Sequence, residues 1–387
     1  MANTITNLVP DMLTALDTVS RELTGLIPSV TSDMTFERAA VGQTVRSPVA
    51  PASAAGDITP AVTPPDDGDQ TIGNQSMSIT KARRVPIRWN GEQSRGINNT
   101  DISRSRIMQD QFAQAMRTLV NEVELDLAGL HTSASRAYGT AGTTPFATAG
   151  DFTDASFVAK ILKDNGAPPM GNRLVLNTAA SATMIGKQSR TDIAGQDSLL
   201  RQGVLLDTAG FAIRESAQIL TSTAGAMASA TTNNAGYAVG ATVITLATAG
   251  TGVVSAGDII TFAGDTNKYL VSAVTFAGAN PAAGDTITIA EPGLRVAIAA
   301  SATAITVVGA AARNMAFSPS AIVLATRAPA LPEEGDMAVD REIITDPRSG
   351  LSFEVAQYNQ YRQVQYEVSL AWGFKAVKTE HIALLLG

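Results

Sequence analysis

The chain has 387 residues, of which 45% are hydrophobic and only 16% are charged, and its formal net charge is −7. This length suffices for two or three domains with cores of their own. The acidic balance argues against a nucleic-acid binder with a basic stripe, and the absence of cysteine excludes disulfides and thiolate metal sites. We find no signal-peptide pattern and no apolar run that would span a membrane, so we expect folding in a cytoplasm.

Residues 4–30 carry apolar side chains at spacings of three, four and seven, which predicts one amphipathic helix that ends near Gly25 and Pro28. Two interpretations remain open for its apolar stripe. The helix either packs on its own domain or is a terminal arm that docks on a neighbouring subunit or a scaffolding partner. The core-poor segment that follows favours the arm. The stripe residues are Leu8, Met12, Leu16, Val19 and Leu23.

Residues 38–97 contain six prolines and few large apolar side chains, so they cannot bury a core of their own. Their ends, 44–49 and 77–89, read as strands, which predicts a long extended hairpin. Charge is separated along it: acidic Asp57, Asp66, Asp67 and Asp69 lie at one end, and basic Lys81, Arg83, Arg84 and Arg88 lie on the other arm. We expect these charges to contact a neighbouring subunit. Arg83 and Arg84 are equally explained as charges that guard an exposed strand edge.

A long amphipathic helix is predicted over 103–137, because apolar residues recur at every third or fourth position from Met108 to Leu130. Residues 151–220 read as mixed helix and strand. There we expect helices at 155–163 and 178–188 and strands at 173–177 and 211–216.

Composition changes over 221–311, which is rich in Ala, Thr and Gly and nearly free of charge. Short strands are predicted at 239–247, 258–263, 269–276, 285–290, 294–298 and 304–309, separated by turn signals such as Gly264-Asp265. They predict a small antiparallel barrel or sandwich, inserted between two α/β-like parts of the chain. Asp265 and Lys268 are candidates for contacts between neighbouring assemblies, although a solvated turn explains them equally well.

The last part of the chain gives the clearest strand pattern. Residues 364–374 alternate apolar and polar side chains with a strict period of two. The segment 353–358 is the expected hairpin partner, and further apolar strands are predicted at 321–326 and 381–386.

Catalytic motifs are missing from the sequence. It has only two histidines, His131 and His381, at unrelated positions, and it contains no metalloprotease, nucleophile-elbow, P-loop or dinucleotide-binding pattern. The acidic cluster Glu333, Glu334 and Asp336 lies beside glycine and proline, as solvated loops do. We therefore expect no enzyme activity, no cofactor and no metal site.

The order of these parts resembles the major capsid proteins of tailed bacteriophages, which have the HK97-like fold. The segments that carry the resemblance are QGVLLDTAGFAIRES, NMAFSPSAIVLATRAPALP and SGLSFEVAQYNQYRQVQYEVSLAWGFKAVKTEHIALLL. The β-rich insertion looks like that in coat proteins of short-tailed phages. The resemblance thus implies an α+β, HK97-like capsid fold with an inserted antiparallel β-barrel.

The resemblance implies an organisation for the whole chain. Residues 1–39 would be the N-terminal arm and 40–97 the extended loop. A peripheral domain would comprise 98–150 and 346–375 and include the spine helix, and an axial domain would comprise 151–220, 312–345 and 376–387. The insertion domain would be 221–311.

The same resemblance implies a self-assembling icosahedral shell around double-stranded DNA. The expected partners are copies of the chain in hexamers and pentamers, a separate scaffolding protein, a portal protein and in some systems a decoration protein, with assembly in the host bacterial cytoplasm. The alternative is another structural protein of a phage or cell surface, such as a tail tube, a fibre or a surface layer. A hydrolase with an unrecognised site is a more distant alternative.

Overall fold

The fold is that of a computed structural model, which describes residues 25–34, 38–49, 57–58, 60, 62–63, 73–97, 101–147, 152–188, 205, 207–248, 250–278, 281–345 and 351–387. The predicted N-terminal stripe over Leu8, Met12, Leu16, Val19 and Leu23 lies outside these residues, and so do Asp66, Asp67 and Asp69.

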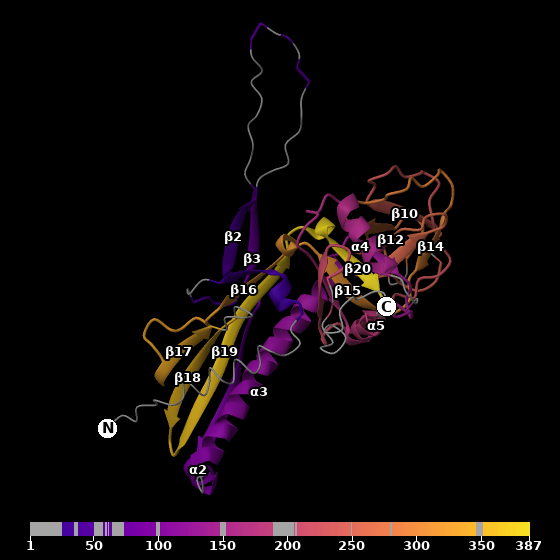
Figure 1. Ribbon diagram of the computed structural model, residues 1–387. Coiled ribbons are helices and arrows are strands. Elements are labelled where there is room, and N and C mark those ends of the chain that lie inside the picture. Colours follow the sequence, from indigo (N-terminus) through magenta and orange to yellow (C-terminus); the bar gives the residue numbers. More distant parts are fainter. Residues whose placement is uncertain are drawn as a thin grey trace.

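A long helix lies along a twisted six-stranded sheet and forms the elongated half of the molecule (Figure 1). The sheet has the order β1-β16-β19-β18-β17, and β4 pairs with the other edge of β19. Its strands are β1 (Thr31–Met34), β4 (Lys81–Asn90), β16 (Ile322–Arg327), β17 (Ala338–Thr345), β18 (Ser352–Gln360) and β19 (Gln363–Ala376). The predicted hairpin of the C-terminal region is confirmed as β18 and β19, whereas β17 was not expected.

The helix α3 (Asp101–Ala128) follows the short α2 (Gly91–Ile97) and buries its predicted stripe against this sheet. Phe112 packs edge-on against Tyr366 of β19, with ring centroids 5.7 Å apart. The prediction that the helix continues to residue 137 is wrong. A 3₁₀ turn, η2 (Gly129–Ser133), follows Ala128, and β5 (Arg136–Gly139) then joins the second sheet. The pairing of β5 with β12 (Lys268–Thr275) and β20 (Ile382–Leu386) therefore takes these residues out of the helix.

The second sheet continues as β5-β20-β15-β6-β7, in which β5 with β20 and β6 with β7 are parallel pairs. The strands are β6 (Asn172–Leu176), β7 (Phe211–Glu215), β15 (Ala311–Phe317) and β20 (Ile382–Leu386). Helices α4 (Thr153–Asp164) and α5 (Thr178–Gln188) share a buried apolar cluster with one face of this sheet. The other face joins the core beneath α3, so one continuous core links both halves.

The Ala/Thr/Gly-rich segment forms a closed antiparallel barrel. Its strands pair in the cycle β11-β14-β9-β10-β13-β12, and β12 pairs back to β11. The strands are β9 (Ala230–Thr232), β10 (Val243–Thr248), β11 (Ile259–Phe262), β12 (Lys268–Thr275), β13 (Thr286–Ile289) and β14 (Ala304–Val307). The predicted strand over 294–298 is wrong, because that stretch makes only an isolated bridge from Ile298 to Tyr237, and β9 completes the barrel instead.

The barrel is not a separate body, since Lys268 and Tyr269 of β12 pair with Ala137 and Arg136 of β5. A short strand before the barrel, β8 (Thr221–Ser222), also pairs with β15. Strand pairing thus joins the inserted segment to the rest of the protein, in addition to the two peptide connections at its ends.

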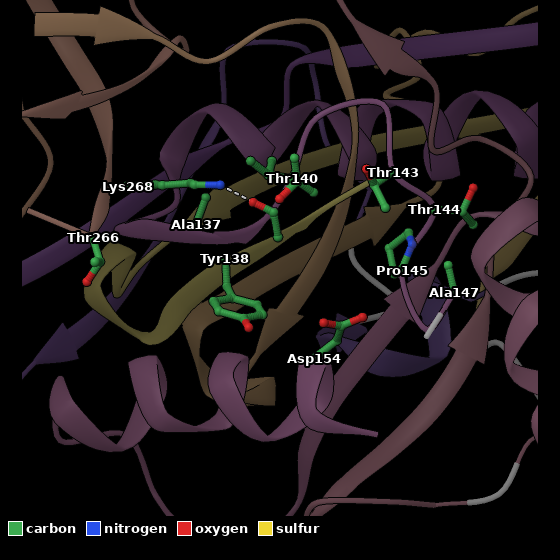
Figure 2. A pocket seen from close by; sticks show the side chains of 12 residues that line it. Ala137, Tyr138, Thr140, Thr143, Thr144, Pro145, Ala147, Asp154, Thr266 and Lys268 are labelled. Atoms are coloured by element: carbon green, nitrogen blue, oxygen red, sulfur yellow. Dashed lines mark hydrogen bonds between the residues drawn. The ribbon is translucent and has the colours of Figure 1, made fainter. Parts of the chain in front are cut away.

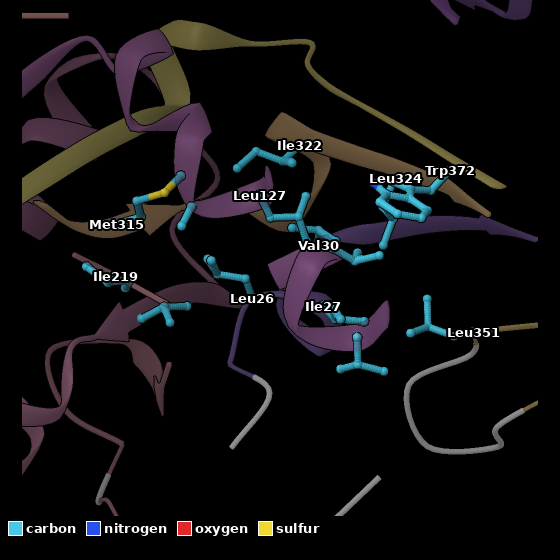
Figure 3. Packing of buried hydrophobic residues seen from close by; sticks show 14 of the residues in the cluster. Leu26, Ile27, Val30, Leu127, Ile219, Met315, Ile322, Leu324, Leu351 and Trp372 are labelled. Carbon is cyan, nitrogen blue, oxygen red and sulfur yellow. The ribbon is translucent and has the colours of Figure 1, made fainter. Parts of the chain in front are cut away.

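The residues just after Gly25 pack into the apolar core that links the two halves of the molecule (Figure 3). Leu26 and Ile27 have no exposed surface, and a 3₁₀ turn, η1 (Ile27–Ser29), leads into β1, which pairs with β16 in parallel. This stretch is not the end of an α-helix as predicted. Leu26 and Ile27 therefore belong to the chain's own core.

Candidate assembly surface

A two-stranded ribbon stands away from the body (Figure 1). It consists of β2 (Thr44–Val49) and β3 (Gly73–Ser78), paired antiparallel from Thr44 opposite Ser78 to Val49 opposite Gly73. The predicted arm over 77–89 is therefore corrected: its first residues belong to β3, whereas Lys81–Asn90 is β4 of the main sheet. Residues 81–90 pair with β19 along their whole length and therefore do not continue the β2–β3 hairpin.

The root of the ribbon is held against the body by backbone contacts. The amide of Gly42 donates to Ile79 O at 2.9 Å, and the amide of Thr80 donates to Trp372 O at 3.0 Å. At Gly373 the backbones approach so closely that an added Cβ would lie 2.9 Å from the carbonyl carbon of Ser78. Only glycine fits there without displacement, so the direction in which the ribbon leaves the body is fixed.

Beyond its root the ribbon contributes little to the chain's own core. Ile58 and Val62, which lie in the segment that joins β2 to β3, have relative exposures of 99% and 105%. Asp57 in the same segment is also exposed. An extended element with exposed apolar side chains gains little burial within its own subunit.

The four basic residues of the predicted arm all find partners within the same chain. Lys81 pairs with Asp126 at 2.7 Å and Arg83 with Glu122 at 3.1 Å, which ties β4 to α3. On the other face of β4, Arg84 pairs with Glu367 at 2.7 Å.

Arg88 donates a hydrogen bond to Oε1 of Gln365 at 3.3 Å, so it too is held by β19. The side chains of Arg83 and Arg84 remain 59% and 60% exposed. Those two arginines therefore keep a surface that a neighbouring subunit can reach.

Asp265 and Lys268 do not pair with each other. Asp265 accepts hydrogen bonds from the Tyr269 hydroxyl at 2.6 Å and from the amide of Asn267 at 2.8 Å. Burial together with this hydrogen bond raises the pKa of Tyr269 to about 12. Lys268 donates to Gly139 O, and burial lowers the pKa of its ammonium. Both residues thus fix the barrel internally or to β5.

A cavity of about 320 Å³ lies where the barrel meets β5 and α4 (Figure 2). The charged side chains that line it, Lys268 and Asp154, form hydrogen bonds with the backbone of the same chain. Lys268 is held by Gly139, and Oδ2 of Asp154 accepts a hydrogen bond from the amide of Phe146 at 2.7 Å. The arrangement offers no nucleophile next to a base.

The two histidines make separate structural contacts. Nδ1 of His131 lies 2.9 Å from Ala128 O, and His381 is buried at the end of a 3₁₀ turn, η4 (Thr379–His381), directly before β20. Burial lowers the pKa of both imidazoles. Within the described residues there is no cluster of three potential metal ligands, and none of the described helices is both long and apolar enough to span a membrane.

One buried carboxylate was missed by the sequence analysis. Glu124 of α3 is 1% exposed and accepts hydrogen bonds from the amides of Leu26 at 3.0 Å and Ile27 at 2.8 Å and from the Ser216 hydroxyl at 2.9 Å. Burial raises its pKa, and the hydrogen bonds partly oppose that rise. The available signal was its position on the apolar stripe, between Val123 and Leu127. Glu124 caps η1 and anchors the N-terminal segment in the core.

Among known proteins, solved structures of low identity match this chain. No family model matches the chain, and no curated protein matches it. Among solved structures, the capsid of cyanophage P-SCSP1u is 10% identical with a TM-score of 0.48, over 94% of this chain and 88% of that one. A virus-like particle from Pyrococcus furiosus is 11% identical with a TM-score of 0.43, over 97% of this chain and 98% of that one.

A third similar structure is the capsid of Myoviridae phage XM1, at 10% identity and a TM-score of 0.41, over 95% of this chain and 93% of that one. At such scores the superpositions run over nearly the whole chain without matching it closely in detail. The structure itself has a mixed α/β architecture, with a ribbon, a long helix along a sheet and a second sheet with two helices.

Proposed function

We propose that this chain is the major capsid protein of a tailed bacteriophage, which self-assembles into an icosahedral shell around double-stranded DNA. The observation that carries the proposal is the β2–β3 ribbon, which is fixed at its root and has exposed apolar residues beyond it. Such an element is stabilised by contact with another subunit. Its role is structural, and the proposal involves no cofactor.

The parts of the chain take the following roles in this proposal. The extended loop comprises residues 40–80, because β4 belongs to the sheet beneath α3. A peripheral domain contains α3 with β4, β17, β18 and most of β19, and an axial domain contains the second sheet with α4 and α5. The barrel within 221–311 is the insertion domain. Residues 1–24 form the arm, whose apolar stripe docks on a neighbouring subunit or a scaffolding protein.

The proposed partners follow from this role. Copies of the chain associate as hexamers and pentamers, with a scaffolding protein, a portal protein and in some systems a decoration protein as further partners. The net charge of −7 suits a container, because an acidic wall does not trap the DNA that it encloses. The place of assembly is the cytoplasm of the bacterial host, and the final location is the virion.

Electron microscopy of the purified chain, expressed alone and with candidate scaffolding proteins, tests the proposal. Closed shells are the expected result. Open tubes would favour a tail-tube or surface-layer protein, and a persistent monomer under all conditions would contradict both. A matched variant in which residues 51–71 are replaced by a short Gly-Ser turn should remain folded, because that segment lies beyond the ribbon strands, and should assemble poorly.

A further inference from the structure

Two arginines lie on one face of the second sheet, at its β7 edge. Arg173 of β6 and Arg214 of β7 belong to neighbouring parallel strands, in which Arg173 is opposite Ala212 and Val175 is opposite Arg214. Because side chains alternate along a strand, both arginines project from the face that carries Val175. The opposite face of these strands packs on the cluster that includes residues of α4 and α5.

The surface between the two arginines is apolar. Val175 has no exposed surface, and neither does Phe317 of β15, which is directly opposite Arg173 in the antiparallel pair. Both arginine side chains are half-buried and extend from this apolar surface. Since such a surface excludes water from one side of a charge, the attraction between that charge and a ligand is stronger than in bulk water.

The charges of this pair are poorly satisfied. The Nε atom of each arginine is buried without a hydrogen-bond partner, and neither guanidinium forms an ion pair with a carboxylate in the described part of the chain. Burial and the charge of Arg173 lower the pKa of Arg214, and Asp207 offsets only part of this effect. The carboxylate of Asp207 instead accepts the amide of Ile213 at 3.3 Å. Two adjacent cations without a matching counter-charge favour the binding of an anion.

A phosphate group matches two arginines better than a carboxylate does. Each guanidinium presents a planar fork of N–H donors, which fits two oxygens of a phosphate or a carboxylate at once. One fork occupies both oxygens of a carboxylate, whereas a phosphate group has further oxygens and can bridge two forks. A phosphate group with a free terminus also carries a charge of about −1.5 to −2 at pH 7, close in magnitude to the combined charge of the two arginines.

We propose that Arg173 and Arg214 form a binding site for a phosphate group at the β7 edge of the second sheet. Free phosphate and the backbone of a nucleic acid are the two sources of this chemistry, and the second source rests on the proposed function, in which the shell encloses DNA. The site is compatible with the net charge of −7, because salt screens the more distant charges of the chain. Shell assembly does not enter the proposal, so its failure would leave the capsid role untouched.

Equilibrium dialysis of the full-length protein against radiolabelled inorganic phosphate, with the ionic strength held constant by chloride, tests the site. We expect one phosphate per chain. The double variant Arg173→Gln and Arg214→Gln should bind at least about tenfold more weakly, because charge-assisted hydrogen bonds are lost. The matched control Arg83→Gln and Arg84→Gln loses the same charge from arginines that have carboxylate partners, and should bind as the natural protein does. No uptake by the natural protein, or equal uptake by the first double variant, would overturn the proposal.

Chemical modification of the natural protein locates the bound phosphate without any substitution. Phenylglyoxal forms adducts with guanidinium groups, and peptide mass spectrometry gives the rate at each arginine. Phosphate should slow the modification of Arg173 and Arg214 several-fold at constant ionic strength and leave Arg83 unchanged. In a parallel reaction with a short DNA duplex, protection of the same two arginines assigns a nucleic-acid backbone as a source, and protection by phosphate alone assigns the free anion. Rates at Arg173 and Arg214 that neither phosphate nor the duplex changes would contradict the site.

Discussion

Lys81 of β4 and Asp126 of α3 form an ion pair at 2.7 Å, and the second oxygen of Asp126 accepts a hydrogen bond from Nε1 of Trp372 at 2.9 Å. The ammonium of Lys81 also lies 5.9 Å from the centre of the Trp372 ring. One carboxylate therefore joins the long helix to β4 and β19. Lys81, for which the sequence suggested an intersubunit contact, thus has partners within its own chain.

Substitution Asp126→Ala should lower the free energy of unfolding by about 1–3 kcal/mol, because it leaves the indole N–H of the buried Trp372 without an acceptor. Urea unfolding followed by tryptophan fluorescence measures the change. The control Glu122→Ala removes a more exposed pair with Arg83 and should cost less than about 1 kcal/mol. Equal losses in both variants would contradict this ranking.

Substitution Gly373→Ala should displace the root of the ribbon, since the new methyl group would meet the carbonyl of Ser78. We expect a loss of about 1–3 kcal/mol in stability, and faster proteolysis between β3 and β4. The control Gly186→Ala adds a methyl group to α5 with no atom within 4 Å and should be neutral or stabilising by up to about 1 kcal/mol. If Gly373→Ala behaves like this control, the close approach does not fix the ribbon.

The burial of Glu124 predicts a specific pH dependence. Burial raises its pKa in the folded chain above the unfolded value of about 4.3. The proton is therefore bound more tightly in the folded state, and the associated stability is present below about pH 4. It is lost as the pH rises through the folded pKa.

Substitution Glu124→Gln removes this titration but keeps one oxygen that can accept from Leu26 or Ile27. Relative to the natural protein, the variant should gain stability as the pH is raised from 4 to 7. Chemical unfolding at several pH values gives the difference. Two curves that stay parallel over this range would show that Glu124 does not titrate between the folded and unfolded states.

The exposed faces of Arg83 and Arg84 give a test of assembly. Their partners Glu122 and Glu367 lie in the same chain, but both arginines are more than half exposed, so reversal of their charge should leave the monomer folded. The double variant Arg83→Glu and Arg84→Glu should assemble into fewer shells, as counted by electron microscopy. Since exposed pairs are screened beyond about 8–10 Å, salt should weaken assembly of the natural chain. Normal assembly of the double variant at physiological salt would remove these arginines from the interface.

The barrel should fold when residues 221–311 are expressed alone, because it encloses its own apolar cluster, including Ile244, Val271 and Ile287. We expect a β-rich circular dichroism spectrum and a cooperative thermal transition. Its stability should be lower than in the whole chain, since excision exposes the edge of β12 that pairs with β5. A fragment without a cooperative transition would show that this edge is needed for folding.

Local patterns in the sequence were sufficient for most elements of the fold. The alternating side chains of β19, the apolar run of β20 and the short apolar stretches of the barrel each predicted a strand. In the structure most of these side chains are buried against neighbouring elements. The polar residue Asn177 directly precedes α5 and caps it, since its Oδ1 accepts the Ala180 amide at 2.9 Å. By contrast, β15 and β17 carry charged residues within short strands and gave no clear period.

The sequence by itself determined the stripe of α3, the ribbon with its poor core and the β-rich insertion, because each follows from side-chain order within one segment. Only the tertiary structure decided that β4 joins β19, that the helix gives way to β5 after Ala128, and that Glu124 faces the amides of Leu26 and Ile27. These outcomes depend on register and burial between residues up to hundreds of positions apart. No local pattern encodes which distant strand will offer a partner, so the sequence alone could not show that Lys81 and Arg83 pair with Asp126 and Glu122 of their own chain.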